Sequence, residues 1–267
     1  MLDSIGSFFK HRTMPSLPTA LVTNDDGIDS PFLHKLIEGL IPYFQIKIAA
    51  PMREQSWIGR AMTRHRPLDW REKNIHNCQS WAIDGTPSDC INIALAHFLK
   101  SKPDVVISGI NIGFNASIPL IYSSGTIAGA LEGANWGIPA VAASQSLAHD
   151  LFASISRTRE LPESIDNTLA ASAQHTAQFA QTLTGQDNPN LIVHNLNFPQ
   201  ETTVDTPWET TIPARFEWGS LFTQNANGQF QFQYKTKSPF TQLQLSDHKA
   251  LENGSISHSS LNFSNLR

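Results

Sequence analysis

Between residues 19 and 199, short β-branched runs alternate with longer segments of helical spacing, and this alternation constrains the fold more than any other feature. A regular succession of strand and helix is typical of a parallel sheet covered by helices. We therefore predict an α/β fold with a Rossmann-like, three-layer core and a mostly parallel sheet. The predicted strands are 20–24, 46–51, a run from 81, 105–108, 138–144 and 190–199, and the predicted helices are 31–40, a run from 86, 125–137 and 163–185.

The helix predictions rest on spacing and on start signals. Apolar residues between 31 and 40 fall on one helical face, and Pro31 suits the first turn of a helix. The second helix has Thr86 or Ser88 as a cap, with the acidic Asp89 in its first turn. The segment 125–137 consists largely of small residues, so we expect this helix to pack closely on its neighbours.

The composition changes beyond Pro199, where residues 201–245 are rich in Thr, Gln and Phe. Phe230, Phe232 and Tyr234 alternate with glutamines, which is the period of a half-exposed strand. This alternation predicts a hairpin that stands off the core. Because an isolated hairpin is only marginally stable in water, we expect it to pack on a partner subunit in a homodimer or homotetramer.

The expected organisation therefore has three parts. Residues 1–18 form a loosely ordered N-terminal tail, residues 19–200 form the α/β core, and residues 201–267 form the hairpin and a C-terminal extension that supplies the oligomer contact.

Composition narrows the range of partners. The chain has 19 Lys and Arg against 23 Asp and Glu, so its formal charge of −4 provides no basic field for a long nucleic acid. No apolar run reaches the ~18 residues of a membrane helix, so we expect no membrane contact. Two cysteines are too few for a disulfide framework, and a reducing, cytoplasmic location is the simpler interpretation.

Polar side chains gather in the turns that leave the predicted strands. In open parallel sheets, ligands bind outside the carboxyl ends of the strands. Four turns carry polar groups there: residues 24–27, 53–56, 110–115 and 122–126. They contain carboxylates, amides and hydroxyls but no histidine or cysteine, which is the ligand set of a hard cation such as Mg²⁺ or Mn²⁺. The adjacent Asp25 and Asp26 repel each other, and a divalent cation would offset that repulsion.

The last of these turns, Ser124-Gly125-Thr126, opens the small-residue helix. The backbone N–H groups, the hydroxyls and the positive end of the helix dipole form an anion site there. A cation beside an anion site suggests hydrolysis of a phosphate ester.

Each feature also has an ordinary structural interpretation when it is taken alone. Asp-Asp-Gly is most often a turn, Ser56 and Asn111 are typical loop residues, and Ser124 is a typical N-cap. His65 lies among three arginines that form either a solvated face, which we favour, or a basic patch for a phosphorylated substrate; they are Arg60, Arg64 and Arg66. His34 and His97 lie on predicted helices, where a structural role is the expectation.

Taken in order, five motifs resemble the survival protein E (SurE) family of nucleotidases. They are TNDDGI, APMREQS, DGTPSDC, PDVVISGINIG and IYSSGTIAGALEG. The resemblance covers roughly residues 19–145, with weaker similarity at HNLNFP and DHKALENGSISHSSL. It implies a Rossmann-like phosphatase that uses one divalent cation and hydrolyses nucleoside 5′- and 3′-monophosphates by attack of a metal-bound water.

The resemblance also implies roles for individual residues. The implied metal ligands are Asp25, Asp26, Ser56 and Asn111, and one of the two aspartates would take the proton of the water. The implied phosphate-binding residues are Ser124, Gly125, Thr126 and the nearby Asn115. Asp26→Asn is expected to abolish hydrolysis and keep the fold, on the expectation that this acid is exposed.

This chain departs from the family pattern at two positions. Trp57 stands where the family has glycine after the serine, so its indole would narrow the pocket or stack on a nucleobase. Ser123 is an additional serine before Ser124-Gly125-Thr126, which leaves open which hydroxyl faces the phosphate.

Three other classes were weighed against the hydrolase. A phospho-acceptor receiver module needs an aspartate at the end of a central strand, where this chain has Ser108 to Asn111. A dinucleotide-binding oxidoreductase needs a glycine-rich fingerprint after the first strand, where this chain has Asn-Asp-Asp-Gly. A catalytically weakened nucleotide-binding regulatory protein of the same fold remains the main alternative.

Overall fold

The computed structural model describes residues 16–217, 219–233 and 245–265. Residues 1–15 of the expected N-terminal tail and Tyr234 of the expected hairpin lie outside these ranges. The strands of the main sheet are β1 (Thr19–Thr23), β2 (Gln45–Pro51), β3 (Trp70–Ile75), β4 (Cys78–Ile83), β5 (Val105–Ile112), β6 (Ala140–Gln145), β7 (Ile192–Phe198), β8 (Trp208–Thr210) and β11 (Ile256–Asn262).

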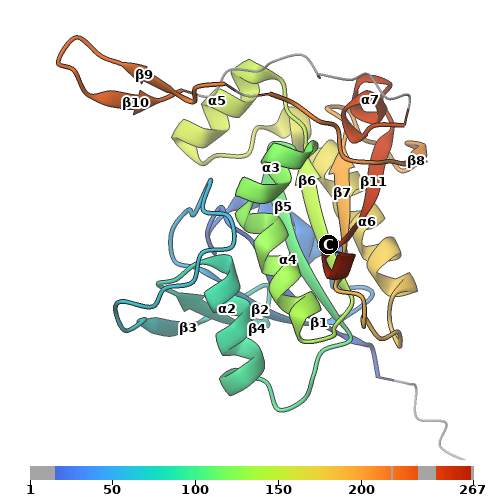
Figure 1. Ribbon diagram of the computed structural model, residues 1–267. Coiled ribbons are helices and arrows are strands. Elements are labelled where there is room, and N and C mark those ends of the chain that lie inside the picture. The colour runs from blue at the N-terminus through green and yellow to red at the C-terminus, as the bar shows by residue number, and fades with distance from the viewer. Residues whose placement is uncertain (1–15, 218, 234–244, 266–267) are drawn as a thin grey trace, which may run out of the picture.

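Within the described residues these strands form one nine-stranded sheet in the order β3-β4-β2-β1-β5-β6-β7-β11-β8 (Figure 1). The inner strands from β4 to β7 are all parallel. The outer strands β3 and β11 run antiparallel to β4 and β7. The strand order reverses at β1, which lies between β2 and β5, and such a switch point is where open α/β sheets bind ligands.

Helices cover both faces of the sheet and complete the predicted three layers (Figure 1). They are α1 (Pro31–Leu40), α2 (Pro87–Ile93), α3 (Ile118–Ser123), α4 (Gly125–Asn135), α5 (His149–Thr158), α6 (Asp166–Thr182) and α7 (Asp247–Glu252). α1 packs with α6 on one face, and α2 packs with α4 on the other. The parallel strands are therefore buried on both sides, which confirms the predicted α/β fold.

Helix α4 shows why its sequence is rich in small residues. A Cβ at Gly133 would lie 2.6 Å from Val106 Cβ, and one at Gly129 would lie 2.8 Å from Thr23 Cγ2. Glycine therefore lets α4 approach β1 and β5 closely, as the sequence predicts. This close approach brings the N-terminus of α4 to the carboxyl end of β1.

The prediction that residues 110–115 form one turn is wrong for residues 110–112, because β5 extends to Ile112. The register of β5 with β6 shifts between Ser108 and Asn111, and pairing resumes at Asn111. Gly109 permits this irregularity, since its φ is +139° and an added Cβ would lie 2.3 Å from the carbonyl oxygen of Ala143. The pairing with β6 holds Asn111 on a strand rather than in a free loop.

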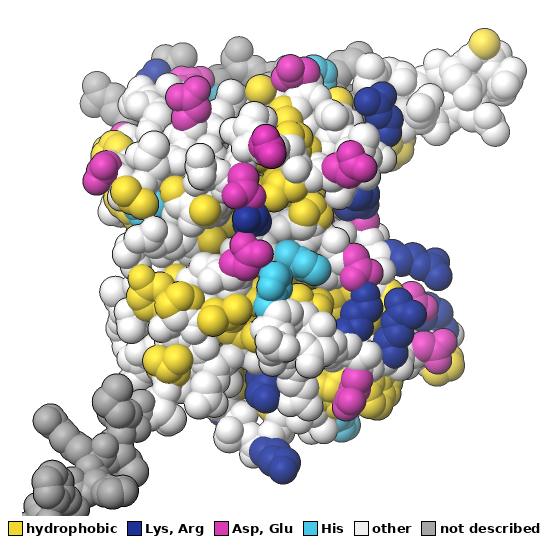
Figure 2. All heavy atoms as spheres, turned by 180° about the vertical axis from the view of Figure 1, so that it is seen from behind, with side chains coloured by type: hydrophobic (Ala, Val, Ile, Leu, Met, Phe, Trp, Pro, Cys, Tyr) yellow, Lys and Arg dark blue, Asp and Glu magenta, His cyan; other side chains and the backbone are white. Residues whose placement is uncertain are grey.

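The C-terminal part of the chain makes two different contributions. The hairpin of β9 (Phe222–Gln224) and β10 (Phe230–Phe232) projects from the body, as predicted (Figures 1 and 2). β11 instead lies inside the main sheet, between β7 and β8, which the sequence did not indicate. The C-terminal segment thus completes the edge of the core and also carries a protruding hairpin.

The surface turned away from the viewer in Figure 1 carries charges of both signs. Figure 2 shows Lys and Arg interspersed with Asp and Glu over this face. An ion pair joins α1 to α6, with Lys35 Nζ 2.7 Å from Asp166 Oδ1. In the part of the chain that the structure describes, no helix combines the length and the apolar character needed to cross a membrane.

Candidate active site

The turn after β1 carries the adjacent carboxylates Asp25 and Asp26. Asp25 Oδ1 accepts a hydrogen bond of 2.6 Å from the Thr126 hydroxyl, and Asp26 Oδ2 accepts one of 3.0 Å from the Ile112 backbone N–H. The Gln55 N–H donates to the Asp25 carbonyl oxygen at 2.7 Å. These contacts join the ends of β1 and β5, the loop after β2 and the first turn of α4 in one place.

Both carboxylates are buried, so the expectation that Asp26 is exposed is wrong. Asp25 is 4% exposed and Asp26 is 8% exposed, because the neighbouring turns cover them. Burial raises the pKa of Asp25 to about 6, although the hydrogen bond from Thr126 lowers it. Burial, and then the charge of Asp25, raise the pKa of Asp26 well above its ordinary value. Two ionised carboxylates here would be costly without a compensating cation.

Ser56 lies in the loop after β2 and is oriented by Glu54. Its hydroxyl donates to Glu54 Oε1 at 2.6 Å, which leaves the lone pairs of the oxygen for another partner. Glu54 Oε2 forms an ion pair with Arg159, and the other guanidinium nitrogen, Nη1, lies 3.4 Å from the carbonyl oxygen of Asp26. Arg159 therefore links the end of α5 to both the Ser56 loop and the aspartate turn.

The two asparagines proposed for this site occupy different settings. Asn111 lies near the end of β5, one residue before the Ile112 N–H that binds Asp26, and its amide donates to Gly113 O at 2.7 Å. Asn115 is buried between β6 and β7, where its amide donates to Ser144 Oγ at 3.0 Å and its N–H to Asn197 Oδ1 at 2.7 Å. Asn111 is thus beside the carboxylates, whereas Asn115 is held by the next strands.

The turn Ser124-Gly125-Thr126 lies at the N-terminus of α4. Ser124 caps the helix, since its hydroxyl accepts from the Ile127 N–H at 3.1 Å. The additional serine, Ser123, turns back and donates to Pro119 O at 2.8 Å, so its hydroxyl is engaged in α3. Gly125 lies directly against Asp25, because an added Cβ would be 2.7 Å from Asp25 Cβ and 2.9 Å from Oδ2. The N-terminus of α4 and the carboxylate pair therefore lie directly against each other.

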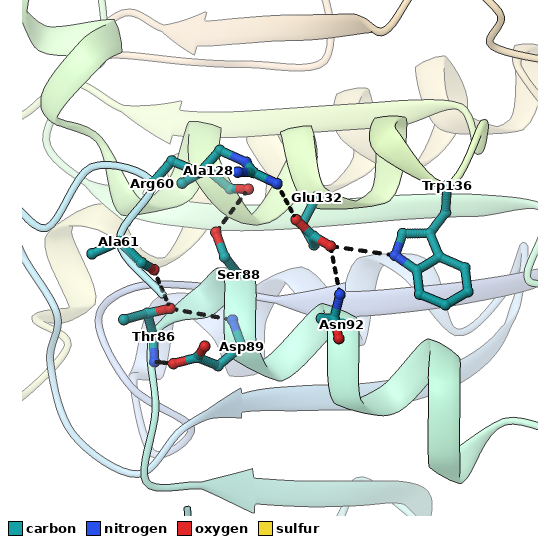
Figure 3. A network of polar contacts seen from close by, with 9 residues as sticks. All are labelled: Arg60, Ala61, Thr86, Ser88, Asp89, Asn92, Ala128, Glu132 and Trp136. Atoms are coloured by element: carbon teal, nitrogen blue, oxygen red, sulfur yellow. Dashed lines mark hydrogen bonds and ion pairs between the residues drawn. The ribbon is translucent and has the colours of Figure 1, made fainter. Parts of the chain in front are cut away.

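The loop that follows Ser56 is fastened to α2 and α4 (Figure 3). Arg60 Nη2 lies 2.5 Å from Oε2 of the buried Glu132, whose other oxygen accepts from Asn92 and Trp136. The Thr86 hydroxyl donates to Ala61 O at 2.8 Å. This network neutralises the charge of Arg60, and Arg66 pairs with Asp84 at 3.0 Å, which for these two arginines favours the predicted solvated face over a phosphate-binding patch.

The donors at this strand end fit a hard divalent cation. Among the described residues, no three His, Cys, Asp or Glu side chains gather into a metal-binding group. A cation here would instead be held by the aspartate pair with hydroxyl and amide oxygens from Ser56 and Asn111. Thr23 Oγ1 and Asn24 Oδ1 are buried without a hydrogen-bond partner among the described residues, at the same strand end. Two carboxyl groups that burial makes costly to ionise therefore lie at the same strand end as unpaired oxygen donors.

The family model described as "Survival protein SurE" matches residues 20–219, which run from the second residue of β1 past the end of β8 and include the whole site. The chain belongs to the SurE family. The family membership confirms the resemblance that the five sequence motifs indicate.

SurE relatives are similar over most of the chain. The "5'-nucleotidase SurE" of Methanosarcina barkeri is 35% identical over 202 residues, which are 74% of this chain and 73% of that protein. The protein of the same name from Geotalea daltonii is 38% identical over 194 residues, 72% of this chain and 68% of its own length. The crystal structure of the SurE protein from Aquifex aeolicus superposes with a TM-score of 0.73 at 25% identity, covering 94% of this chain and 95% of that chain.

Two residues of the site were not among the residues predicted for it. Glu54 stands in one of the four polar turns, but nothing in the sequence indicated that it orients Ser56. Arg159 lies in a segment without a recognisable motif, in the left-handed conformation at the end of α5 with φ 59°. Only the packing of α5 brings Arg159 to Glu54, so local sequence carries no signal for it.

Proposed function

We propose that this chain is a hydrolase that converts nucleoside 5′- and 3′-monophosphates to nucleoside and phosphate. The observation that carries the proposal is the buried Asp25–Asp26 pair against the N-terminus of α4, in a chain whose SurE relatives are named 5′-nucleotidases. A carboxylate pair repels a phosphate by itself, whereas a carboxylate pair that holds a cation attracts one.

The first turn of α4 would bind the phosphoryl group. Helix N–H groups at Gly125 and Thr126 and the positive end of the dipole favour the charge that grows on the phosphoryl oxygens. Asp26 Oδ2 is occupied by the Ile112 N–H, so Oδ1 is the atom we assign to take the proton of the attacking water. Glu54 and Arg159 hold Ser56 and the aspartate turn in place during this step.

One divalent cation, Mg²⁺ or Mn²⁺, is part of the proposal, with Asp25, Asp26, Ser56 and Asn111 as its ligands. It would supply Lewis acidity and offset the charge of the two carboxylates. Its support is the set of oxygen donors and the raised pKa of both aspartates.

The alternative is a nucleotide-binding regulatory protein that has lost catalysis. The buried aspartate pair speaks against it, because ionised carboxylates in this setting cost folding free energy that binding alone does not require.

We also propose a homodimer or homotetramer in the cytoplasm, with residues 201–267 supplying the subunit contact. Support comes from Phe222, Phe230 and Phe232 of the hairpin, which are 53%, 71% and 43% exposed. The free thiols of Cys78 and Cys90 fit a reducing compartment.

The test is phosphate release from a panel of nucleoside monophosphates, with added Mg²⁺ or Mn²⁺ and again with a chelator. Asp26→Asn is expected to lower kcat by about a hundredfold or more, since it removes the proton acceptor and one ligand. It is expected to keep the fold, because the Asn Oδ1 can accept from the Ile112 N–H.

Asp29→Asn is the matched control, since Asp29 follows in the same turn but is exposed and pairs with Lys73. This control is expected to keep wild-type turnover. Absence of phosphate release by the folded wild type with metal present would contradict the proposed hydrolase.

A further inference from the structure

Trp57 is anchored beside the candidate active site through its chain neighbours. It follows Ser56 directly, and the next residue, Ile58, lies near α4, with its Cγ2 3.1 Å from the position of a Gly125 Cβ. The Gly59 N–H then donates to Ser123 O at 2.9 Å. The residues that flank Trp57 are therefore fixed to the site, and the indole starts from a backbone position next to the turn Ser124-Gly125-Thr126.

The backbone of Trp57 has a conformation that disfavours a bulky residue. Its φ is +60°, in the left-handed region that glycine adopts without strain and that a residue with a large side chain rarely adopts. Glycine would relax the backbone at this position, so the presence of tryptophan indicates that its side chain contributes something else.

Aromatic residues of the hairpin hold the indole. The ring of Trp57 meets Phe232 edge to face, with centroids 4.9 Å apart, and Phe232 in turn meets Phe222 at 5.8 Å. We call these three residues the aromatic platform. Trp57 nevertheless remains 39% exposed, so the contact with Phe232 leaves part of its surface accessible. The loop beyond it is also fixed, by Arg60 to Glu132 and by Thr86 to Ala61 (Figure 3).

We infer that the aromatic platform binds the nucleobase of the substrate, with Trp57 stacking on the base and Phe232 of the hairpin holding the indole in place. This inference rests on the proposed nucleotidase function and specifies its substrate as a phosphomonoester with a planar aromatic group. The position of Trp57 suits stacking on the base. In a nucleotide the sugar separates the base from the phosphate, and Trp57 lies next to the proposed metal ligand Ser56 without being a metal ligand itself. The larger purine ring provides more stacking area than a pyrimidine, so purine nucleotides are the favoured substrates.

The experiment compares kcat/KM for AMP with kcat/KM for ribose 5-phosphate, which has the same phosphorylated sugar but no base. Trp57→Gly is expected to fold, because its φ suits glycine. It should lower kcat/KM for AMP by about fivefold to a hundredfold, the range for loss of one base stack, and leave ribose 5-phosphate within about twofold. Trp57→Phe should retain most of the AMP activity because it keeps an aromatic face.

Two hairpin variants test the supporting role of Phe232. Phe232→Ala is expected to lower the ratio of kcat/KM for AMP to kcat/KM for ribose 5-phosphate by less than Trp57→Gly does. The indole is still present in this variant but loses its contact with Phe232. Phe230→Ala is the matched control. Phe230 lies on the same strand, two residues nearer the tip of the hairpin, and is 71% exposed. Its substitution should leave kcat/KM unchanged for both AMP and ribose 5-phosphate.

An equal loss on both substrates in Trp57→Gly would overturn the inference and make Trp57 a residue that positions Ser56. If Trp57→Gly left the ratio of kcat/KM for AMP to kcat/KM for ribose 5-phosphate unchanged, the inference would also be overturned. If the wild type hydrolysed neither substrate, the proposed function would fail, and AMP affinity measured by calorimetry would then decide. Weaker AMP binding by Trp57→Gly would still support stacking, and equal binding would refute it.

Discussion

The contact between Gly125 and Asp25 allows a single added methyl group to test the site. In Gly125→Ala, the new Cβ would lie 2.7 Å from Asp25 Cβ, 2.9 Å from Asp25 Oδ2 and 3.1 Å from Ile58 Cγ2. Carbon atoms in contact are normally about 3.5–4.0 Å apart, so the carboxylate of Asp25 must move by roughly 1 Å. Thr126 holds Asp25 Oδ1 at 2.6 Å, so the shift also disturbs that hydrogen bond.

Overpacking sets the change in stability. Overpacking of a buried site costs about 1–3 kcal/mol, and Gly125 is the first residue of α4, where the preference of a helix interior for alanine over glycine gives no offset. The free energy of unfolding should therefore fall by about 1–3 kcal/mol, and the protein should remain folded. A misplacement of about 1 Å in a reacting site can cost roughly a hundredfold in rate, so we expect kcat/KM to fall by about that factor.

The assay is metal-dependent phosphate release from AMP, with urea unfolding of the same samples. Gly133→Ala is the control, since its Cβ would lie 2.6 Å from Val106 Cβ, on the same helix but between α4 and β5. It should lose about 1–3 kcal/mol of stability and keep wild-type kcat/KM. If folded Gly125→Ala had a kcat/KM within about threefold of wild type, the proposed role of Asp25 at the helix N-terminus would be refuted.

Two further predictions concern assembly and pH. Deleting the hairpin, residues 222–232, is expected to reduce the mass measured by light scattering from that of a homodimer or homotetramer to that of a monomer, and an unchanged mass would refute the proposed contact. Burial, with a smaller effect of the charge of His258 at 3.0 Å, lowers the pKa of the half-buried His194 from 6.5 to about 4. Because the unfolded chain binds this proton more tightly, stability is present above pH 6.5 and is lost as the pH falls towards 4, by about 1–2 kcal/mol after allowance for solvent screening. Urea midpoints at pH 7 and pH 5 should therefore differ less in His194→Gln than in wild type, and an equal difference would contradict the assignment.

Much of the core could be predicted because its signals are local. Helix α1 begins and ends as its apolar spacing predicts, at Pro31 and Leu40. The strands of the parallel sheet are short apolar runs, and the polar turns that follow them identify one edge of the sheet. The position of Asp25 and Asp26 at the end of β1 follows from the same reasoning, as does the small-residue helix that packs close to them.

Edge strands were harder to predict, because their sequences are not those of buried strands. β3 has the polar sequence WREKNI and is mostly exposed, so it lacks the apolar run that indicates a core strand. β11 joins the sheet through antiparallel pairing with β7, about sixty residues earlier in the chain. No local pattern indicates which strand a C-terminal segment will pair with.

The sequence by itself determined the α/β core, the polar turns at the carboxyl ends of its strands and the residue types at the candidate site, since hydrophobic periodicity and turn residues act within a few positions of the chain. The strand order, with its switch point at β1, came from the tertiary structure. Only the tertiary structure decided that Asp25 and Asp26 are buried, that Glu54 and Arg159 orient the Ser56 loop, and that Trp57 meets Phe232. Most of these properties depend on contacts between distant parts of the chain, such as Thr126 with Asp25 and Arg159 with Glu54, which come together because the burial of apolar surface fixes how helices, loops and hairpin pack.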